Sequence, residues 1–169
     1  MATTHVDEIK ATARLAHESA TVREGLFAAM LGDDRDEAVH SAWALTHMPK
    51  TDICYIAEHR VQLTNLAITT PDTSLRRITL SLLERIDWSA PDPDNVPEYY
   101  VALLDFSMEH MMMPDEPYGV RSLCMKLAYT LSLPYPELLE EVRQSLLLIE
   151  PSELGAGVKH TRIKILKSL

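Results

Sequence analysis

Five cationic side chains lie near the starts of predicted helices, and their types and spacing have the clearest chemical potential in the chain. They are Arg76, Arg77, Arg121, Lys159 and Arg162. Guanidinium and ammonium groups bind carboxylates and phosphates, so a row of them on one surface would bind an acidic peptide or a nucleic acid. The alternative role is structural. A cation at the positive start of a helix favours an acidic neighbour, such as Asp72, Asp115 or Glu116.

Other residue types that often form active sites lack the spacing that catalysis or metal binding requires. The seven histidines and two cysteines form no His-Glu-x-x-His or Cys-x-x-Cys arrangement, so we predict no metal site. The methionines of residues 107–113 fall at helical spacing and are expected to fill the core. The sequence contains no phosphate-binding loop and no nucleophile elbow. We therefore expect no cofactor, name no catalytic residue and favour a non-enzymatic protein.

The charge and the hydropathy of the chain restrict its partners. The net charge is −9, although residues 158–169 carry four cations and no acid. A negative surface repels the nucleic acid backbone, which disfavours nucleic acid as a partner. The basic end also suits the negative C-terminal end of a helix. No membrane-spanning run and no signal-peptide pattern is present, so we predict a cytoplasmic protein without membrane contact. Cys54 and Cys124 are expected to be buried, reduced thiols.

The elements that position these side chains are predicted to be helices throughout. Apolar residues at 75, 78, 82 and 86 form one helix face, and the pattern returns at 120, 123, 127 and 131. Proline, aspartate and glycine separate the periodic stretches. We predict about nine helices, with a break near Glu58–Arg60 left open, over residues 4–18, 21–31, 34–48, 52–69, 72–86, 97–112, 117–133, 136–149 and 158–169.

The helical pattern repeats with a period near 40 residues, which indicates stacked helix pairs. The pairs are predicted over 20–48, 51–86, 97–133 and 136–169, behind a capping helix and within a single domain spanning 1–169. The alignment of the pairs places Lys159 at the position of Arg121 and Arg76. The first pair aligns poorly, and His40 is its nearest equivalent of the recurring cation. Trp43, on the same helix, faces either the core or a groove.

The chain resembles HEAT and armadillo-type repeat proteins. The resemblance covers residues 20–169 and rests on three strings that look like second helices of such repeats, namely SLRRITLSLLERI, YGVRSLCMKLAYTL and GVKHTRIKILKSL. It implies an all-α fold, a right-handed α-α superhelix of four helical hairpins plus an N-terminal capping helix. In this family the second helices line a concave face, which usually binds another macromolecule.

The resemblance implies a non-enzymatic module that binds a protein or peptide partner through its concave face. Acidic proteins and peptides are among the expected partners. The alternative is a nucleic-acid-binding or DNA alkylation-repair-type HEAT-like protein, which the net negative charge disfavours. The oligomeric state stays open. The candidate contact residues are Arg76, Arg77, Arg121, Lys159, Arg162, His40 and Trp43.

Overall fold

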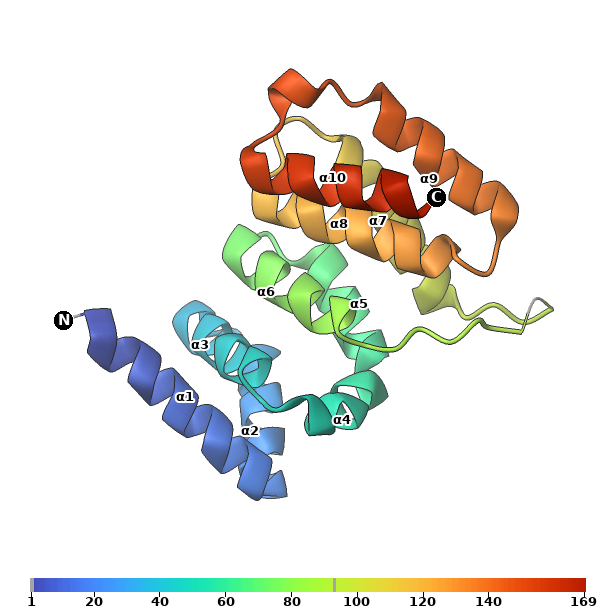
Figure 1. Cartoon of the computed structure of the whole chain (residues 1–169). Helices are drawn as coiled ribbons and strands as arrows, with labels where there is room; N and C mark the ends of the chain where they lie inside the picture. The colour runs from blue at the N-terminus through green and yellow to red at the C-terminus, as the bar shows by residue number, and fades with distance from the viewer. Residues whose placement is uncertain (1, 93) are drawn as a thin grey trace. The chain divides into compact units, whose positions relative to one another are not determined.

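The regular structure of the described residues, 2–92 and 94–169, is entirely helical in the computed structural model (Figure 1). The predicted all-α fold is therefore confirmed, and the helix boundaries agree with the expected ones to within about two residues. The α-helices are α1 (Ala2–Glu18), α2 (Ala20–Met30), α3 (Arg35–Thr46), α4 (Ile53–Glu58), α5 (Arg60–Thr69), α6 (Thr73–Glu84), α7 (Glu98–Met112), α8 (Tyr118–Ser132), α9 (Pro136–Leu148) and α10 (Ala156–Ser168), with short 3₁₀ turns at η1 (Lys50–Asp52) and η2 (Pro151–Glu153).

The predicted helical stretch 52–69 is broken at His59. The backbone of His59 leaves helical geometry at φ −98° and ψ 14°, which ends α4 and begins α5. The His59 ring stays close to the core, with its Nδ1 atom 2.9 Å from the carbonyl oxygen of Tyr55 and its centroid 4.0 Å from that of Phe27. The break therefore raises the number of described α-helices from about nine to ten.

Side-chain caps explain where two of the helices begin. The Asp34 carboxylate accepts a hydrogen bond from the Glu37 N–H at 2.9 Å, and Asp72 accepts one from the Leu75 N–H at 2.8 Å. Each carboxylate satisfies a donor that the helix itself leaves unpaired, and each lies at the positive end of the helix dipole. The two caps are 38 residues apart, which matches the repeat seen in the sequence.

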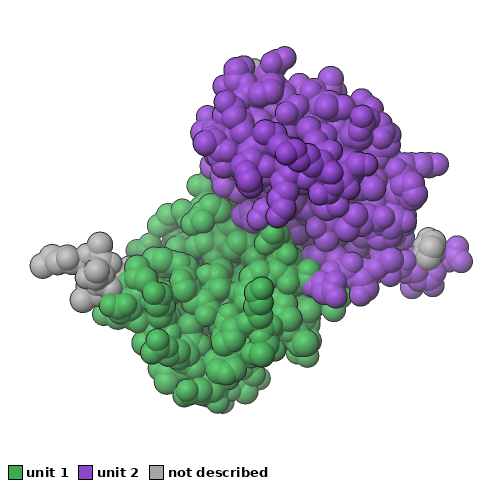
Figure 2. Space-filling view, viewed as in Figure 1, with its two compact units in different colours: residues 1–86 green, residues 87–169 purple. Residues whose placement is uncertain are grey.

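The chain divides into two compact units, residues 1–86 and 87–169, which Figure 2 colours separately. In the first unit α2 packs on α3, α5 packs on α6, and α3 lies beside α6. The first helix, α1, covers α2 and α3 as the predicted capping helix. Every apolar residue of the predicted 72–86 face is buried, namely Leu75, Ile78, Leu80, Leu82, Leu83 and Ile86.

Two arginine contacts set α3 and α6 parallel within the first unit. At the helix starts, the Arg35 guanidinium donates to the carboxylate of Asp72. At the helix ends, Arg85 donates to the carbonyl oxygens of Thr46 at 2.9 Å and Met48 at 3.0 Å. Since starts and ends are both joined, the two second helices run side by side in the same direction.

The second unit repeats this arrangement with α7 packed on α8, α9 on α8, and α10 beside α8. Tyr100 of α7 donates its hydroxyl to the carbonyl oxygen of Leu131 of α8 at 2.6 Å. Ser122 of α8 and Thr161 of α10 share a hydrogen bond of 2.7 Å. Figure 1 shows α8 and α10 side by side. Stacked helical hairpins therefore build both units, as expected.

The two cysteines differ in environment, and the expectation that both are buried is wrong for Cys54. Cys124 is buried, whereas Cys54 is exposed. The reason is that α4 has only six residues and buries Ile56, so a side chain two positions earlier points toward the opposite, solvent-facing side.

Candidate functional site

The seven candidate contact residues fall into two groups. The side chains of Arg76, Arg121 and Arg162 are drawn inward, onto the ends of neighbouring helices. Those of His40, Arg77 and Lys159 are exposed, and Trp43 is half-buried. The sequence could not separate the groups, because all seven lie on second helices near one another in register.

The inward group binds backbone carbonyls. Arg76 of α6 donates to Thr70 at 2.7 Å and to Ala67 at 3.2 Å, both at the C-terminal end of α5. The last carbonyls of a helix lack partners within it and carry the negative end of its dipole, so a guanidinium there is stabilising. Arg76 thereby fastens α6 to the end of α5, the first helix of its own hairpin.

The same contact recurs in the second unit. Arg121 of α8 donates from Nε to the carbonyl oxygen of Met111 of α7 at 3.2 Å, and Arg162 of α10 donates to Leu146 of α9 at 2.6 Å. Arg121 has an exposed fraction of only 1%. A guanidinium in that position is packed within the hairpin and does not reach a partner at the surface.

The acceptors of these arginines differ from the acidic neighbours that the structural alternative anticipated. Asp72 caps α6 and pairs with Arg35. Glu116 has its Oε1 atom 2.6 Å from Nδ1 of His110. In the contacts described above, helix-end carbonyls accept the hydrogen bonds of the arginines.

Sequence alignment places Lys159 at the position of Arg76 and Arg121, but Arg162 is the residue of α10 that makes the carbonyl contact. Arg76, Arg121 and Lys159 are each the fourth residue of their helices. Lys159 is exposed, and Arg162 makes the carbonyl contact from three residues later, on the same helix face.

A fourth residue of this kind, Arg23, was missed by the sequence analysis. It is the fourth residue of α2 and donates from Nη1 to the carbonyl oxygen of Ala16 near the end of α1 at 3.0 Å. The signal was present, because Val22-Arg23 repeats the Val120-Arg121 pair. Because the first predicted helix pair begins at residue 20, its second helix with His40 is the one aligned with the arginine helices, and Arg23 falls outside that alignment.

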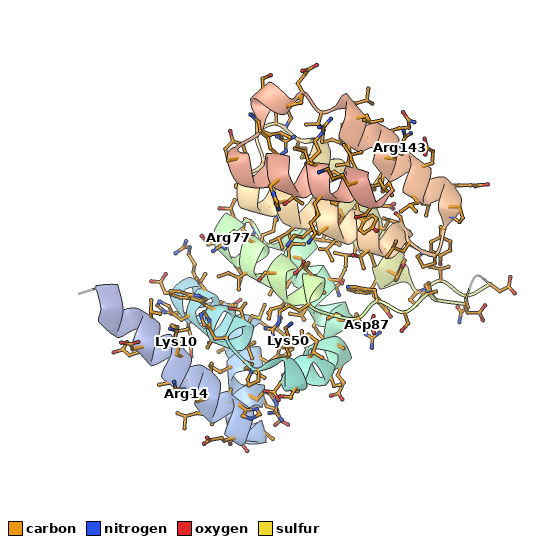
Figure 3. The ribbon with its side chains drawn as sticks, in the orientation of Figure 1. Lys10, Arg14, Lys50, Arg77, Asp87 and Arg143 are labelled. Carbon is orange, nitrogen blue, oxygen red and sulfur yellow. The ribbon has the colours of Figure 1, made fainter. Side chains whose placement is uncertain are left out.

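The outward group in the first unit lies on the two parallel second helices. His40, Trp43 and His47 follow one another at helical spacing on α3, and the Trp43 and His47 rings meet edge to face with centroids 5.9 Å apart. On the neighbouring helix α6, Arg77 is exposed and Ser81 is half-buried. We call these five residues the α3–α6 surface. Figure 3 shows Arg77 projecting from α6 away from the ribbon.

In the second unit, several outward positions of α10 are cationic. Lys159, Lys164 and Lys167 are exposed there, and so is Ile163 with an exposed fraction of 48%. Lys159 is therefore available for contact, in a cationic stretch that also presents apolar surface. We call these four residues the α10 surface.

The side chains of the described residues do not gather into a centre for metal chemistry. No group of three or more histidine, cysteine, aspartate or glutamate residues with a suitable arrangement is found among them. No described helix is long and apolar enough to cross a membrane. The exposed and half-buried side chains on these helices are aromatic, imidazole and cationic groups, and aromatic side chains and arginine are enriched at protein interfaces.

Comparison with known proteins identifies a repeat family. No curated protein and no solved structure matches the chain. A family model described as a HEAT repeat domain matches residues 1–169, which is the entire chain. The family match agrees with the all-helical, repeated structure of the described residues. The chain therefore belongs to the HEAT repeat family, and it is a helical repeat scaffold.

Proposed function

We propose that this protein is a non-enzymatic module that binds a protein partner through its second helices, with the α3–α6 surface as the main contact. The observation that carries the proposal is the parallel placement of α3 and α6. The helix that carries half-buried Trp43 and exposed His40 therefore lies beside the helix that carries exposed Arg77. An aromatic side chain flanked by cationic and imidazole groups is the composition enriched at protein interfaces.

The partner proposed for this surface is an acidic peptide segment. Arg77 supplies a planar guanidinium suited to a carboxylate. Lys159, on the α10 surface, is the corresponding exposed cation of the second unit. Arg76, Arg121 and Arg162 are left out of the contact set, because their guanidinium groups bind helix-end carbonyls.

The test compares exposed arginines that differ in location. The tagged full chain and its Arg77→Glu variant are used to capture proteins from a lysate of the source organism, and captured proteins are quantified by mass spectrometry. Arg14→Glu is the matched control, because Arg14 is also exposed and lies on α1 (Figure 3). We expect Arg77→Glu to lose partners that Arg14→Glu keeps. Identical captured sets would contradict the proposal.

Capture from a nuclease-treated lysate tests whether the partner is a nucleic acid. Capture that disappears after nuclease treatment would favour a nucleic-acid-binding function instead. A net charge of −9 makes us expect capture to survive this treatment.

A further inference from the structure

We propose that the second unit carries a binding site for an alkylammonium group, in a cavity between α7 and α9. The ligand would be the side chain of a lysine in a partner protein or a free aliphatic diamine, which share this chemistry. The site lies on first helices, so it is separate from the α3–α6 surface and does not depend on the proposed function.

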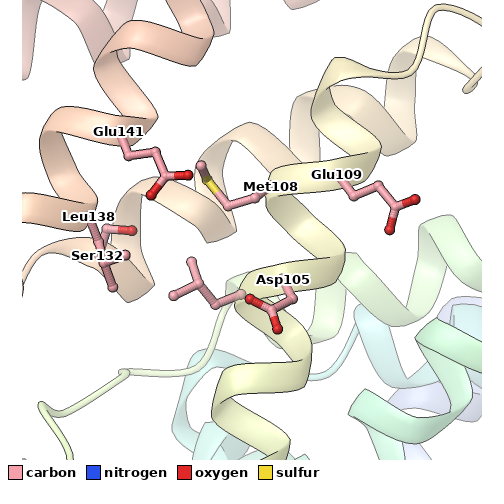
Figure 4. A pocket seen from close by; sticks show the side chains of 7 residues that line it. Asp105, Met108, Glu109, Ser132, Leu138 and Glu141 are labelled. Atoms are coloured by element: carbon pink, nitrogen blue, oxygen red, sulfur yellow. The ribbon is translucent and has the colours of Figure 1, made fainter.

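The cavity has a volume of about 280 Å³. This is slightly below the usual range for small-molecule sites, roughly 300–1,000 Å³, and suits one extended side chain or a short aliphatic molecule. Figure 4 shows the Glu141 carboxylate and Met108 reaching toward the same space, while the Glu109 carboxylate points away from it. The lining residues are Leu104, Asp105, Met108, Glu109, Ser132, Leu138 and Glu141.

The helices around the cavity attract cations. Together α7 and α9 carry six carboxylates and one guanidinium, that of Arg143. Within the described part of the chain, Asp105 and Glu141 make no hydrogen bond and no ion pair, whereas neighbouring Glu140 binds Arg143 at 3.1 Å and Gln144 at 2.5 Å. Two uncompensated carboxylates at one opening create a negative potential that favours a positively charged group.

A buried hydroxyl provides an independent indication of a ligand. Ser132 has an exposed fraction of 0%, and its Oγ atom has no hydrogen-bond partner among the described residues. A buried hydroxyl without a partner is costly, so such a group calls for an explanation. Figure 4 shows Ser132 beside Leu138 on the wall of the cavity. An ammonium group has three donors and no acceptor, so it supplies the hydrogen bond that the Ser132 oxygen lacks. Because this hydroxyl has no accessible surface, binding also requires the side chains that cover it to shift.

Apolar side chains complete the fit to an alkyl chain. Leu104, Met108 and Leu138 line the same cavity as the carboxylates. Lysine-type groups place their methylene chains along apolar surface and keep the charged end at polar groups. A bare metal ion would gain nothing from the apolar wall, and the described residues form no three-residue metal-binding group.

The experiment measures binding to the full chain by isothermal titration calorimetry. The probes are cadaverine and Nα-acetyl-lysine methylamide, with 1-pentanol as an uncharged molecule of similar length. The variants are Glu141→Gln and Asp105→Asn, with Glu140→Gln as the matched control on the same helix. Ser132→Ala removes the hydroxyl, and its thermal stability is measured as a second readout.

We expect both amines to bind and pentanol not to bind. Glu141→Gln and Asp105→Asn should each weaken amine binding by about fivefold, the upper range for a partly exposed ion pair, and Glu140→Gln should leave it unchanged. Ser132→Ala should weaken binding without lowering thermal stability.

The two probes distinguish the sources of the ligand. If the lysine derivative binds with the same affinity as cadaverine, the site is assigned to a partner's lysine. If only cadaverine binds, the site is assigned to a free diamine. Absence of binding by both amines would overturn the proposal. Equal losses in Glu140→Gln and Glu141→Gln would do the same, because they would reduce the effect to diffuse surface charge.

Discussion

Replacement of Arg121 by methionine is expected to leave the free energy of unfolding nearly unchanged, although Arg121 occupies a recurring position. Its exposed fraction is 1%, and Nε donates to the Met111 carbonyl at 3.2 Å. Its Nη1 atom has no hydrogen-bond partner among the described residues. A buried charge with an unpaired donor is stabilised poorly, and an apolar side chain of similar length can replace it at little cost.

The expected magnitude follows from opposing contributions. Loss of a hydrogen bond from a charged donor costs about 1.5–3 kcal/mol, and removal of a buried, unpaired polar group returns about 1–3 kcal/mol. The methionine chain retains most of the packing of the arginine chain. The net change for Arg121→Met should therefore lie within about 2 kcal/mol of zero. Arg121→Ala also removes the packed chain and should cost about 2–5 kcal/mol, as for other large-to-small core substitutions.

Urea denaturation followed by far-ultraviolet circular dichroism measures these differences. Arg14→Met is the control for an exposed arginine and should change the free energy of unfolding by less than about 0.5 kcal/mol. A loss in Arg121→Met as large as that in Arg121→Ala would refute the reasoning. It would mean that the hydrogen bond from the Arg121 guanidinium to the Met111 carbonyl, and not the packing of the side chain, holds α7 to α8.

Two further predictions concern pH. Asp72→Ala should cost about 1 kcal/mol at neutral pH, the usual value for an N-cap, and the hydrogen bond from the Leu75 N–H and the neighbouring Arg35 lower the pKa of Asp72. The stability that Asp72 contributes is therefore complete above its ordinary pKa and is lost as pH falls through its lowered, folded-state pKa. Chemical denaturation at several acidic pH values measures this loss, and a difference between wild type and Asp72→Ala that does not change with pH would contradict it. Tyr100→Phe should cost about 1 kcal/mol, because the bond to the Leu131 carbonyl is lost. Burial raises the pKa of Tyr100 to about 12, so as pH rises the unfolded chain loses the Tyr100 hydroxyl proton before the folded chain does. The free energy of unfolding of the wild type should therefore fall between about pH 10 and 12. An equally steep fall in Tyr100→Phe would show that Tyr100 is not responsible.

Most of the fold could be predicted because the relevant signals are local. The 3.6-residue period of apolar residues locates the helices, and Asp34 and Asp72 mark two of their starts. The break at His59 was anticipated only as an option, since no proline or glycine causes it. That the two units form one domain stays a prediction.

The candidate site could be predicted only in part, because side-chain direction depends on tertiary packing. Arg76 and Arg77 are adjacent in sequence, yet Arg76 turns to the end of α5 and Arg77 faces solvent. The periodicity of the sequence could not assign the carbonyl contact to Arg162 in place of Lys159, because both residues lie on the same face of α10. The cavity beside Glu141 is formed by side chains from α7, α8 and α9, so no sequence motif reveals it.

The central claim is that a protein partner binds the α3–α6 surface, and amide hydrogen exchange with and without a captured partner tests it most directly. We expect the partner to slow exchange in peptides covering 35–48 and 73–86 and to leave exchange in α1 unchanged. Slowed exchange confined to the first helices α2 and α5, with 35–48 and 73–86 unaffected, would contradict it.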